Sequence, residues 1–182
     1  MNSRIGLLGG SFNPVHCGHL RMAVEAREAL GLDRVELVCA PSPPHKPSRG
    51  LAAFEDRFAL LRESLDGLDG LVPSDIEAGR EGPSYTSDTL DEYARREPDA
   101  QLFFVLGLPS MYELHQWHEG LGLPGKTNLA ALRRGAAEPA GLPEYLATHW
   151  PGVICLGEGV WEFPGGRRLY LLDAPVLEIS GT

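Results

Sequence analysis

Short apolar runs alternate along the chain with stretches in which apolar residues recur every three or four positions. Runs without a helical period predict buried strands, and they cover residues 5–8, 35–40, 71–78, 102–106, 128–132 and 169–172. Helical spacing predicts helices, and it covers residues 18–30, 54–65, 84–96, 111–118 and 142–149. Thr86 or Ser87 is the expected N-cap of the 84–96 helix.

The regular alternation of strands and helices with short connectors predicts βαβ units. We therefore expect an α/β fold, a Rossmann-like doubly wound parallel sheet with helices on both faces. No repeat or linker divides the chain, so residues 1–182 are expected to form a single domain. In such a sheet a ligand binds outside the carboxyl ends of the strands. The loops after Leu8, Ala40 and Leu106 are the first places to look for chemistry.

Charge and cysteine content narrow the class of protein. Sixteen basic and 25 acidic residues give a net charge of −9, which argues against a nucleic-acid binder or a basic membrane-surface protein. Any phosphate must then be held locally. Three separated cysteines, Cys17, Cys39 and Cys155, form no Cys-x-x-Cys pair, so we expect reduced, half-buried thiols. The sequence has neither a signal peptide nor a membrane-length apolar segment, and a cytoplasmic protein is expected.

The loop after the first predicted strand reads GGSFNPVHCGHL, from Gly9 to Leu20. Glycines let the backbone approach a ligand closely, and the free N–H groups at the start of the next helix form an anion site. His16 and His19 are three residues apart, so both lie on one face of the first turn. Imidazoles there can donate hydrogen bonds to phosphoryl oxygens, and one such donor is worth roughly 3 kcal/mol in the transition state.

Other interpretations of this loop fit less well. The glycine spacing matches neither the dinucleotide fingerprint nor a Walker loop. A metal site built from His16, Cys17 and His19 would lack a fourth ligand, and consecutive side chains diverge on a helix; no metal-ligating side chains are therefore predicted. The structural alternative is that His16 caps a turn and His19 is a satisfied, half-buried histidine. The strand, Gly-Gly and His-x-Gly-His in this order favour a functional site.

These residues resemble the signature of the nucleotidylyltransferase superfamily with its (H/T)xGH motif. The form GG[ST]F[DN]P[VI]HxGHL is similar to that of bacterial nicotinate-nucleotide adenylyltransferases. Further segments match that family in order along nearly the whole chain: PPHK at 43–46, YTSDTL at 85–90, FFVLG at 103–107, Trp117, and ISGT at 179–182.

The resemblance implies that ATP and nicotinate mononucleotide, with Mg²⁺, give nicotinate adenine dinucleotide and pyrophosphate in NAD biosynthesis. It assigns catalysis to His16 and His19, which would hold the triphosphate and its transition state. Thr86 would meet the nicotinate carboxylate, and Trp117 would stack on the pyridine ring. The residues implied in ATP binding are Gly9, Gly10, Ser11, Phe12, Gly18, Lys46, Gly107, Arg133, Ser180 and Thr182.

Each of these assignments has a structural alternative. Lys46 can be a solvated surface lysine, Thr86 a plain N-cap, Trp117 a core residue and Arg133 an exposed arginine. The position of Lys46 after Pro-Pro-His is what favours a phosphate contact. The sequence does not choose between a monomer and a homodimer.

The match has three departures. Pro109 stands where the family has an aspartate, and His118 where it often has a second aromatic residue. The sequence stops at Thr182, before the arginine and terminal helices expected from the family, and we therefore expect a C-terminal end shortened relative to the family. Alternative functions are adenylyl transfer to nicotinamide mononucleotide or phosphopantetheine, cytidylyl transfer to a small phosphate, or a catalytically impaired nucleotide-binding paralogue.

Overall fold

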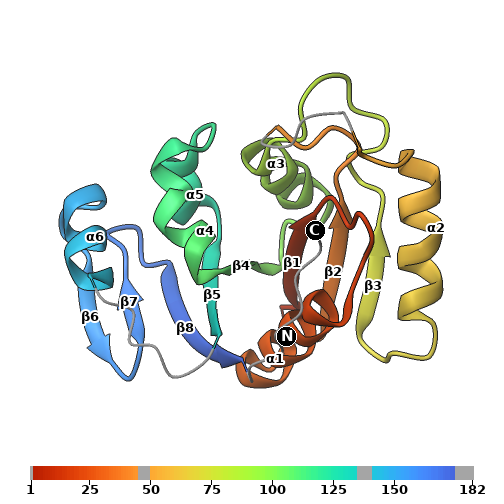
Figure 1. Ribbon diagram of the computed structural model, residues 1–182. Coiled ribbons are helices and arrows are strands. Elements are labelled where there is room, and N and C mark those ends of the chain that lie inside the picture. Colours follow the sequence, from red (N-terminus) through yellow and green to blue (C-terminus); the bar gives the residue numbers. More distant parts are fainter. Residues whose placement is uncertain (1, 45–49, 135–140, 175–182) are drawn as a thin grey trace.

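The strands pair into one continuous twisted sheet (Figure 1). The structure is a computed structural model, and it describes residues 2–44, 50–134 and 141–174. The strands are β1 (Arg4–Gly10), β2 (Arg34–Cys39), β3 (Leu71–Ser74), β4 (Gln101–Gly107), β5 (Asn128–Arg134), β6 (Ile154–Gly157), β7 (Val160–Glu162) and β8 (Arg168–Ala174). Their order is β3-β2-β1-β4-β5-β8-β7-β6.

The strands from β3 to β8 in this order are parallel, as predicted. The strands β6 and β7 were not predicted, and they add an antiparallel hairpin beside β8. Their sequence is short and interrupted by glycines, and all four residues of β6 are exposed, so it carries no buried apolar run. The predicted doubly wound α/β fold is confirmed, with this hairpin as an addition at one edge.

Helices occur in the five predicted regions. The helices are α1 (Cys17–Leu30), α2 (Phe54–Leu65), α3 (Thr86–Arg96), α4 (Leu108–Glu113), α5 (Leu123–Lys126) and α6 (Leu142–His149), with 3₁₀ turns η1 (Leu114–Gln116) and η2 (Gly120–Gly122). The short helix α5 and the turn η2 were not predicted. The single helix predicted over 111–118 is instead α4 followed by η1. None of the helices in the described ranges combines the length and apolar character needed to cross a bilayer.

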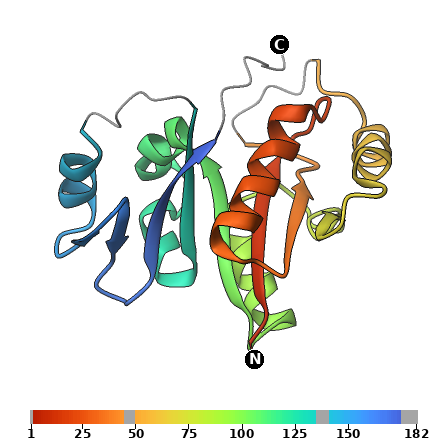
Figure 2. The same cartoon turned by 90° about the horizontal axis from the view of Figure 1, so that it is seen from below.

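Alternate residues of the central strands face two separate apolar layers. On one face, residues such as Leu8, Leu37 and Val105 pack with Ala23 and Ala26 of α1 and with the apolar side of α2. The other face carries the neighbouring positions, which pack against α3, α4, α5 and α6. Figure 2 shows α1 lying in front of the central strands. This two-sided burial is the reason that the strands read as continuous apolar runs.

The three thiols differ in exposure. Cys39 is buried at the end of β2, and burial raises the pKa of its thiol to about 11. Cys17 and Cys155 are exposed. The expectation of three half-buried thiols is therefore wrong, because Cys17 begins a helix at the surface and Cys155 lies on the exposed edge strand.

A buried arginine joins three segments at the carboxyl ends of β1 and β2. Arg57 of α2 is 1% exposed. Its guanidinium donates hydrogen bonds to backbone carbonyl oxygens on the loop after β1, on the loop after β2 and just before α2. These carbonyls belong to Ser11, Ala40, Pro41 and Ala52, at 2.9 Å for Ala40 and 3.0 Å for Ala52. A planar fork of five donors suits several carbonyl groups at once.

We expect Arg57→Leu to lower the free energy of unfolding by about 3 kcal/mol, because buried carbonyl groups would lose their donor. The melting temperature should fall by roughly 6–12 °C. Thermal unfolding followed by circular dichroism measures the change. Arg62→Leu on the exposed side of the same helix is the matched control, and it should shift the midpoint little. Equal midpoints for the two variants would contradict the role given to Arg57.

Candidate functional site

The loop after β1 is built by side chains that hold its backbone in place. Phe12 adopts a left-handed conformation with φ 43° and is 1% exposed. Its ring packs over Gly10, where a Cβ would come within 3.0 Å of it. Asn13 was predicted only as part of a turn, but its amide binds the segment before α2. It donates to the Gly50 carbonyl at 2.9 Å and accepts from the Ala52 N–H at 3.1 Å.

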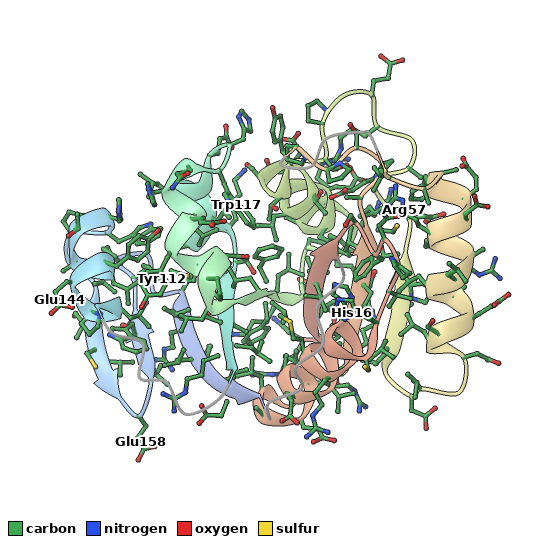
Figure 3. All side chains as sticks on the ribbon, viewed as in Figure 1. His16, Arg57, Tyr112, Trp117, Glu144 and Glu158 are labelled. Carbon is green, nitrogen blue, oxygen red and sulfur yellow. The ribbon has the colours of Figure 1, made fainter. Side chains whose placement is uncertain are left out.

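The two histidines of the motif face one another at the start of α1 (Figure 3 labels His16). His16 is the N-cap residue, and its backbone N–H donates to Nδ1 of His19 at 3.3 Å. The two rings stack with centroids 3.7 Å apart, and the Phe12 ring meets His19 edge-on at 5.0 Å. Because Nδ1 of His19 accepts a hydrogen bond, the neutral ring carries its proton on Nε2. His16 therefore caps α1, which was the structural alternative for this residue. In this tautomer Nε2 of His19 is a hydrogen-bond donor.

A pocket lies at the carboxyl ends of β1, β2 and β4. It brings together Gly9, Gly10 and Ser11 with Thr86 and Trp117, five of the predicted site residues. The complete lining is Gly9, Gly10, Ser11, Val38, Ala40, Pro43, Pro44, Glu77, Ser84, Tyr85, Thr86, Phe104, Trp117 and His118. A Cβ on Gly9 would meet nothing nearer than 3.8 Å, the Phe104 ring. Packing within the protein therefore leaves open space beside the backbone of Gly9.

The first turn of α3 forms one wall of this pocket. The N-cap is Tyr85 and not Thr86 or Ser87, which are the first two helical residues. The prediction of a Thr or Ser cap is therefore wrong, because both residues lie inside the helix. The Tyr85 ring stacks on His118 with centroids 4.2 Å apart. The first turn of a helix presents N–H groups without intrahelical partners, and Thr86 brings this turn to the pocket.

Trp117 forms the facing wall. It follows η1 in an extended conformation and is half-buried. Its ring meets Phe104 of β4 edge-on at 6.2 Å. Figure 3 shows Trp117 on the side of α4 and α5 that faces α3. Trp117 is thus packed against the core and also lines the pocket, so a core position and a place in the binding site are compatible.

Glu77 is a buried carboxylate in the pocket wall that the sequence did not single out. It is 5% exposed and accepts a hydrogen bond from the Thr89 hydroxyl. Arg80 donates to the same hydroxyl at 3.0 Å. Burial raises the pKa of Glu77, against the lowering effect of hydrogen bonds from Thr89 and Ser84. Glu77 therefore fixes the segment that leads into α3.

Other predicted residues are not part of the pocket lining, among them Phe12 and both histidines of the motif. Gly18 is buried in the first turn of α1, and Gly107 ends β4 as the N-cap of α4. Arg133 is the penultimate residue of β5 and forms an ion pair with Asp173 of β8, whose pKa it lowers. The structure does not bring Arg133 to the pocket lining. Lys46, Ser180 and Thr182 lie outside the described residues.

Pro109 occupies a position that the fold accommodates. It lies in the first turn of α4, directly after Leu108. A backbone N–H there has no intrahelical acceptor, so proline removes no hydrogen bond from the helix. The departure from the family aspartate therefore changes the local chemistry and leaves the end of β4 intact.

Within the described ranges, no group of three His, Cys, Asp or Glu side chains is placed to hold a metal ion. Mg²⁺ commonly binds through substrate phosphates and keeps several waters, so such an ion needs no cage of protein ligands.

The fold and this site define a nucleotidyltransferase: the cytidylyltransferase-like family model matches residues 7–181, and the chain belongs to that family. Among its members the chain groups with the nicotinate-nucleotide adenylyltransferases. A protein of Maridesulfovibrio salexigens named "Probable nicotinate-nucleotide adenylyltransferase" is 38% identical over 179 residues, which span 98% of this chain and 83% of the relative. A protein of Pelobacter propionicus with the same name is 40% identical over 181 residues, 98% of this chain and 84% of the relative. The resemblance drawn from the motifs is confirmed.

Solved structures share the fold at lower identity. The Plasmodium falciparum nicotinic acid mononucleotide adenylyltransferase complexed with NaAD superposes with a TM-score of 0.73 at 19% identity. The match covers 97% of this chain and 78% of that one. This likeness supports the α/β architecture independently of sequence.

The raised pKa of Glu77 makes a prediction about stability and pH. A carboxyl whose pKa is higher when folded than when unfolded binds protons more tightly in the folded state, so its contribution weakens as pH rises from the unfolded pKa through the folded one. We expect the stability of the wild type relative to Glu77→Gln to decrease as the pH rises from about 4, the ordinary pKa of a glutamate carboxyl, toward neutral. Thermal unfolding of both proteins across this range measures it. A constant difference would contradict the raised pKa.

Proposed function

We propose that this protein transfers the adenylyl group of ATP to nicotinate mononucleotide, giving nicotinate adenine dinucleotide and pyrophosphate. The names of relatives that align with 98% of the chain support this activity. The observation that carries it is the shared pocket of the Gly9–Ser11 loop, the start of α3 and Trp117. In this one cavity, the glycine loop lets a phosphate approach the backbone, the start of α3 attracts an anion, and Trp117 supplies an aromatic face.

The acceptor binds between α3 and Trp117 in this proposal. The first turn of α3 attracts the nicotinate carboxylate through its N–H groups and its dipole. Trp117 offers its ring to the pyridine ring. ATP binds along the Gly9–Ser11 loop toward the start of α1, and a Cβ position on Gly9 has no atom nearer than 3.8 Å.

The reaction is an in-line displacement at the α-phosphorus of ATP. A phosphate oxygen of the mononucleotide forms the new P–O bond, and the bond to the bridging oxygen breaks as pyrophosphate leaves with its electron pair. His19 donates from Nε2 to the phosphoryl oxygens, on which negative charge accumulates. His16 stacks against His19 and holds its ring by the backbone hydrogen bond.

Mg²⁺ enters this proposal with ATP. The ion would bind the triphosphate oxygens and water and would neutralise charge on the leaving pyrophosphate. The residues of this chain then act on the same oxygens by hydrogen bonding and position.

We expect purified protein with ATP and Mg²⁺ to release pyrophosphate when nicotinate mononucleotide is the acceptor. A coupled phosphate assay, with nicotinamide mononucleotide and phosphopantetheine offered in parallel, measures the choice of acceptor. Pyrophosphate release chiefly with another acceptor would support adenylyl transfer but assign a different acceptor. Folded protein whose melting temperature rises with ATP, but which releases no pyrophosphate with any acceptor, would instead be a nucleotide-binding paralogue.

We expect His19→Ala to lower kcat by about a hundredfold or more, because a donor to the transition state is removed. The variant also loses one capping hydrogen bond, so its melting temperature is recorded beside its activity. His115→Ala, a surface histidine whose ring contacts Tyr145, is the matched control and should keep full turnover. Unchanged kcat in His19→Ala would remove His19 from the mechanism.

A further inference from the structure

A charged cluster joins the two walls of the pocket on the side of α5. Lys126, the last residue of α5, donates to the Ser87 hydroxyl at 2.7 Å and to Asp91 at 2.8 Å. Its ammonium also lies 3.4 Å from a carboxylate oxygen of Glu119. Ser87 in turn donates to that same oxygen of Glu119. One ammonium therefore contacts two carboxylates and one hydroxyl.

The cluster contacts residues next to the pocket lining on both sides. Ser87 follows Thr86 in the first turn of α3, and Glu119 follows the Trp117–His118 pair. Glu119 has a left-handed backbone with φ 51°, a conformation that a non-glycine residue adopts at a cost. The hydrogen bonds of its side chain to Ser87 and Lys126 offset that cost. They also fix how far the Trp117 wall stands from α3.

The same cluster sets the charge at the start of α3. The Glu119 carboxylate occupies the neighbourhood of the helix N-terminus, where an anion is favoured. The Ser87 hydrogen bond and Lys126 lower the pKa of Glu119, so it is ionised at neutral pH. Burial acts against the charge of Lys126, but Asp91 and Glu119 raise its pKa above the ordinary value. Asp88 already places one carboxylate in the first turn of α3. Without the ammonium, the carboxylates of Glu119 and, one turn further along, Asp91 would also oppose a further anion near this helix end.

We propose that Lys126 is a specificity-determining positioning residue that keeps the start of α3 attractive to the carboxylate of the acceptor. The inference rests on the proposed function, because it takes the acceptor to bind between Thr86 and Trp117. Lys126 acts through Ser87 and Glu119. It should therefore matter for nicotinate mononucleotide, whose ring carries a carboxylate, and much less for nicotinamide mononucleotide, whose ring carries a neutral amide.

The test compares the two acceptors in wild type and K126M. We expect kcat/KM for nicotinate mononucleotide to fall by about fivefold, mainly through KM, relative to kcat/KM for the amide. The KM for ATP should stay unchanged. K126R should keep the wild-type preference because it keeps the charge, and E119Q combined with K126M should recover part of it because one opposing carboxylate is gone.

A control removes an ion pair of similar kind elsewhere. R168M breaks the pair between Arg168 and Glu162 at the β7–β8 edge, and it should leave the acid-to-amide preference unchanged. Equal losses with both acceptors in K126M would show a purely structural role and overturn the proposal. An unchanged preference in K126M would overturn it as well. A wild type inactive with both acceptors would contradict the proposed function itself.

Discussion

The carboxyl end of the sheet depends on one buried cation. Arg57 reaches from α2 beneath the loops that follow β1 and β2, and its guanidinium is hydrogen-bonded to their carbonyl oxygens. Burial of a charge costs several kcal/mol unless polar groups replace water, and here the backbone carbonyls do so. Because Ser11 is one of these groups, the loop that lines the pocket is held before any ligand arrives. A preformed loop loses less entropy on binding.

The hydrophobic pattern predicts most of the order of strands and helices. A strand covered on both faces must be apolar at consecutive positions, and residues 102–106 satisfy this at every position. The β6–β7 hairpin escaped prediction for the opposite reason, since an exposed edge strand needs no apolar run. Helix ends were less accurate. Tyr85 is the N-cap of α3, and its ring stacks on His118, a residue 33 positions away. Local propensity cannot anticipate such a contact.

The site was predictable where a motif concentrates it. The loop residues Gly9 to Ser11, Thr86 and Trp117 line one pocket, whereas His16 and His19 are not among its lining residues. The sequence pattern around Arg57 could have predicted that this arginine is buried. It lies on the apolar side of its helix, among Phe54, Phe58 and Leu61, where an arginine needs a specific partner. Glu77 and Lys126 left none, because their roles come from contacts with Thr89 and with Ser87 and Glu119 that only the folded chain creates.

A protein with a net charge of −9 that binds two anionic nucleotides must solve its electrostatics locally. In the proposed reaction two helix N-termini, those of α1 and α3, face the substrates from opposite faces of one sheet. Helix dipoles act within about one turn, so a single nearby carboxylate can cancel their effect. Glu119 is such a carboxylate, and Lys126 offsets it. In this proposal the preference for an acidic acceptor depends on the charge balance around the first turn of α3, which also carries Asp88.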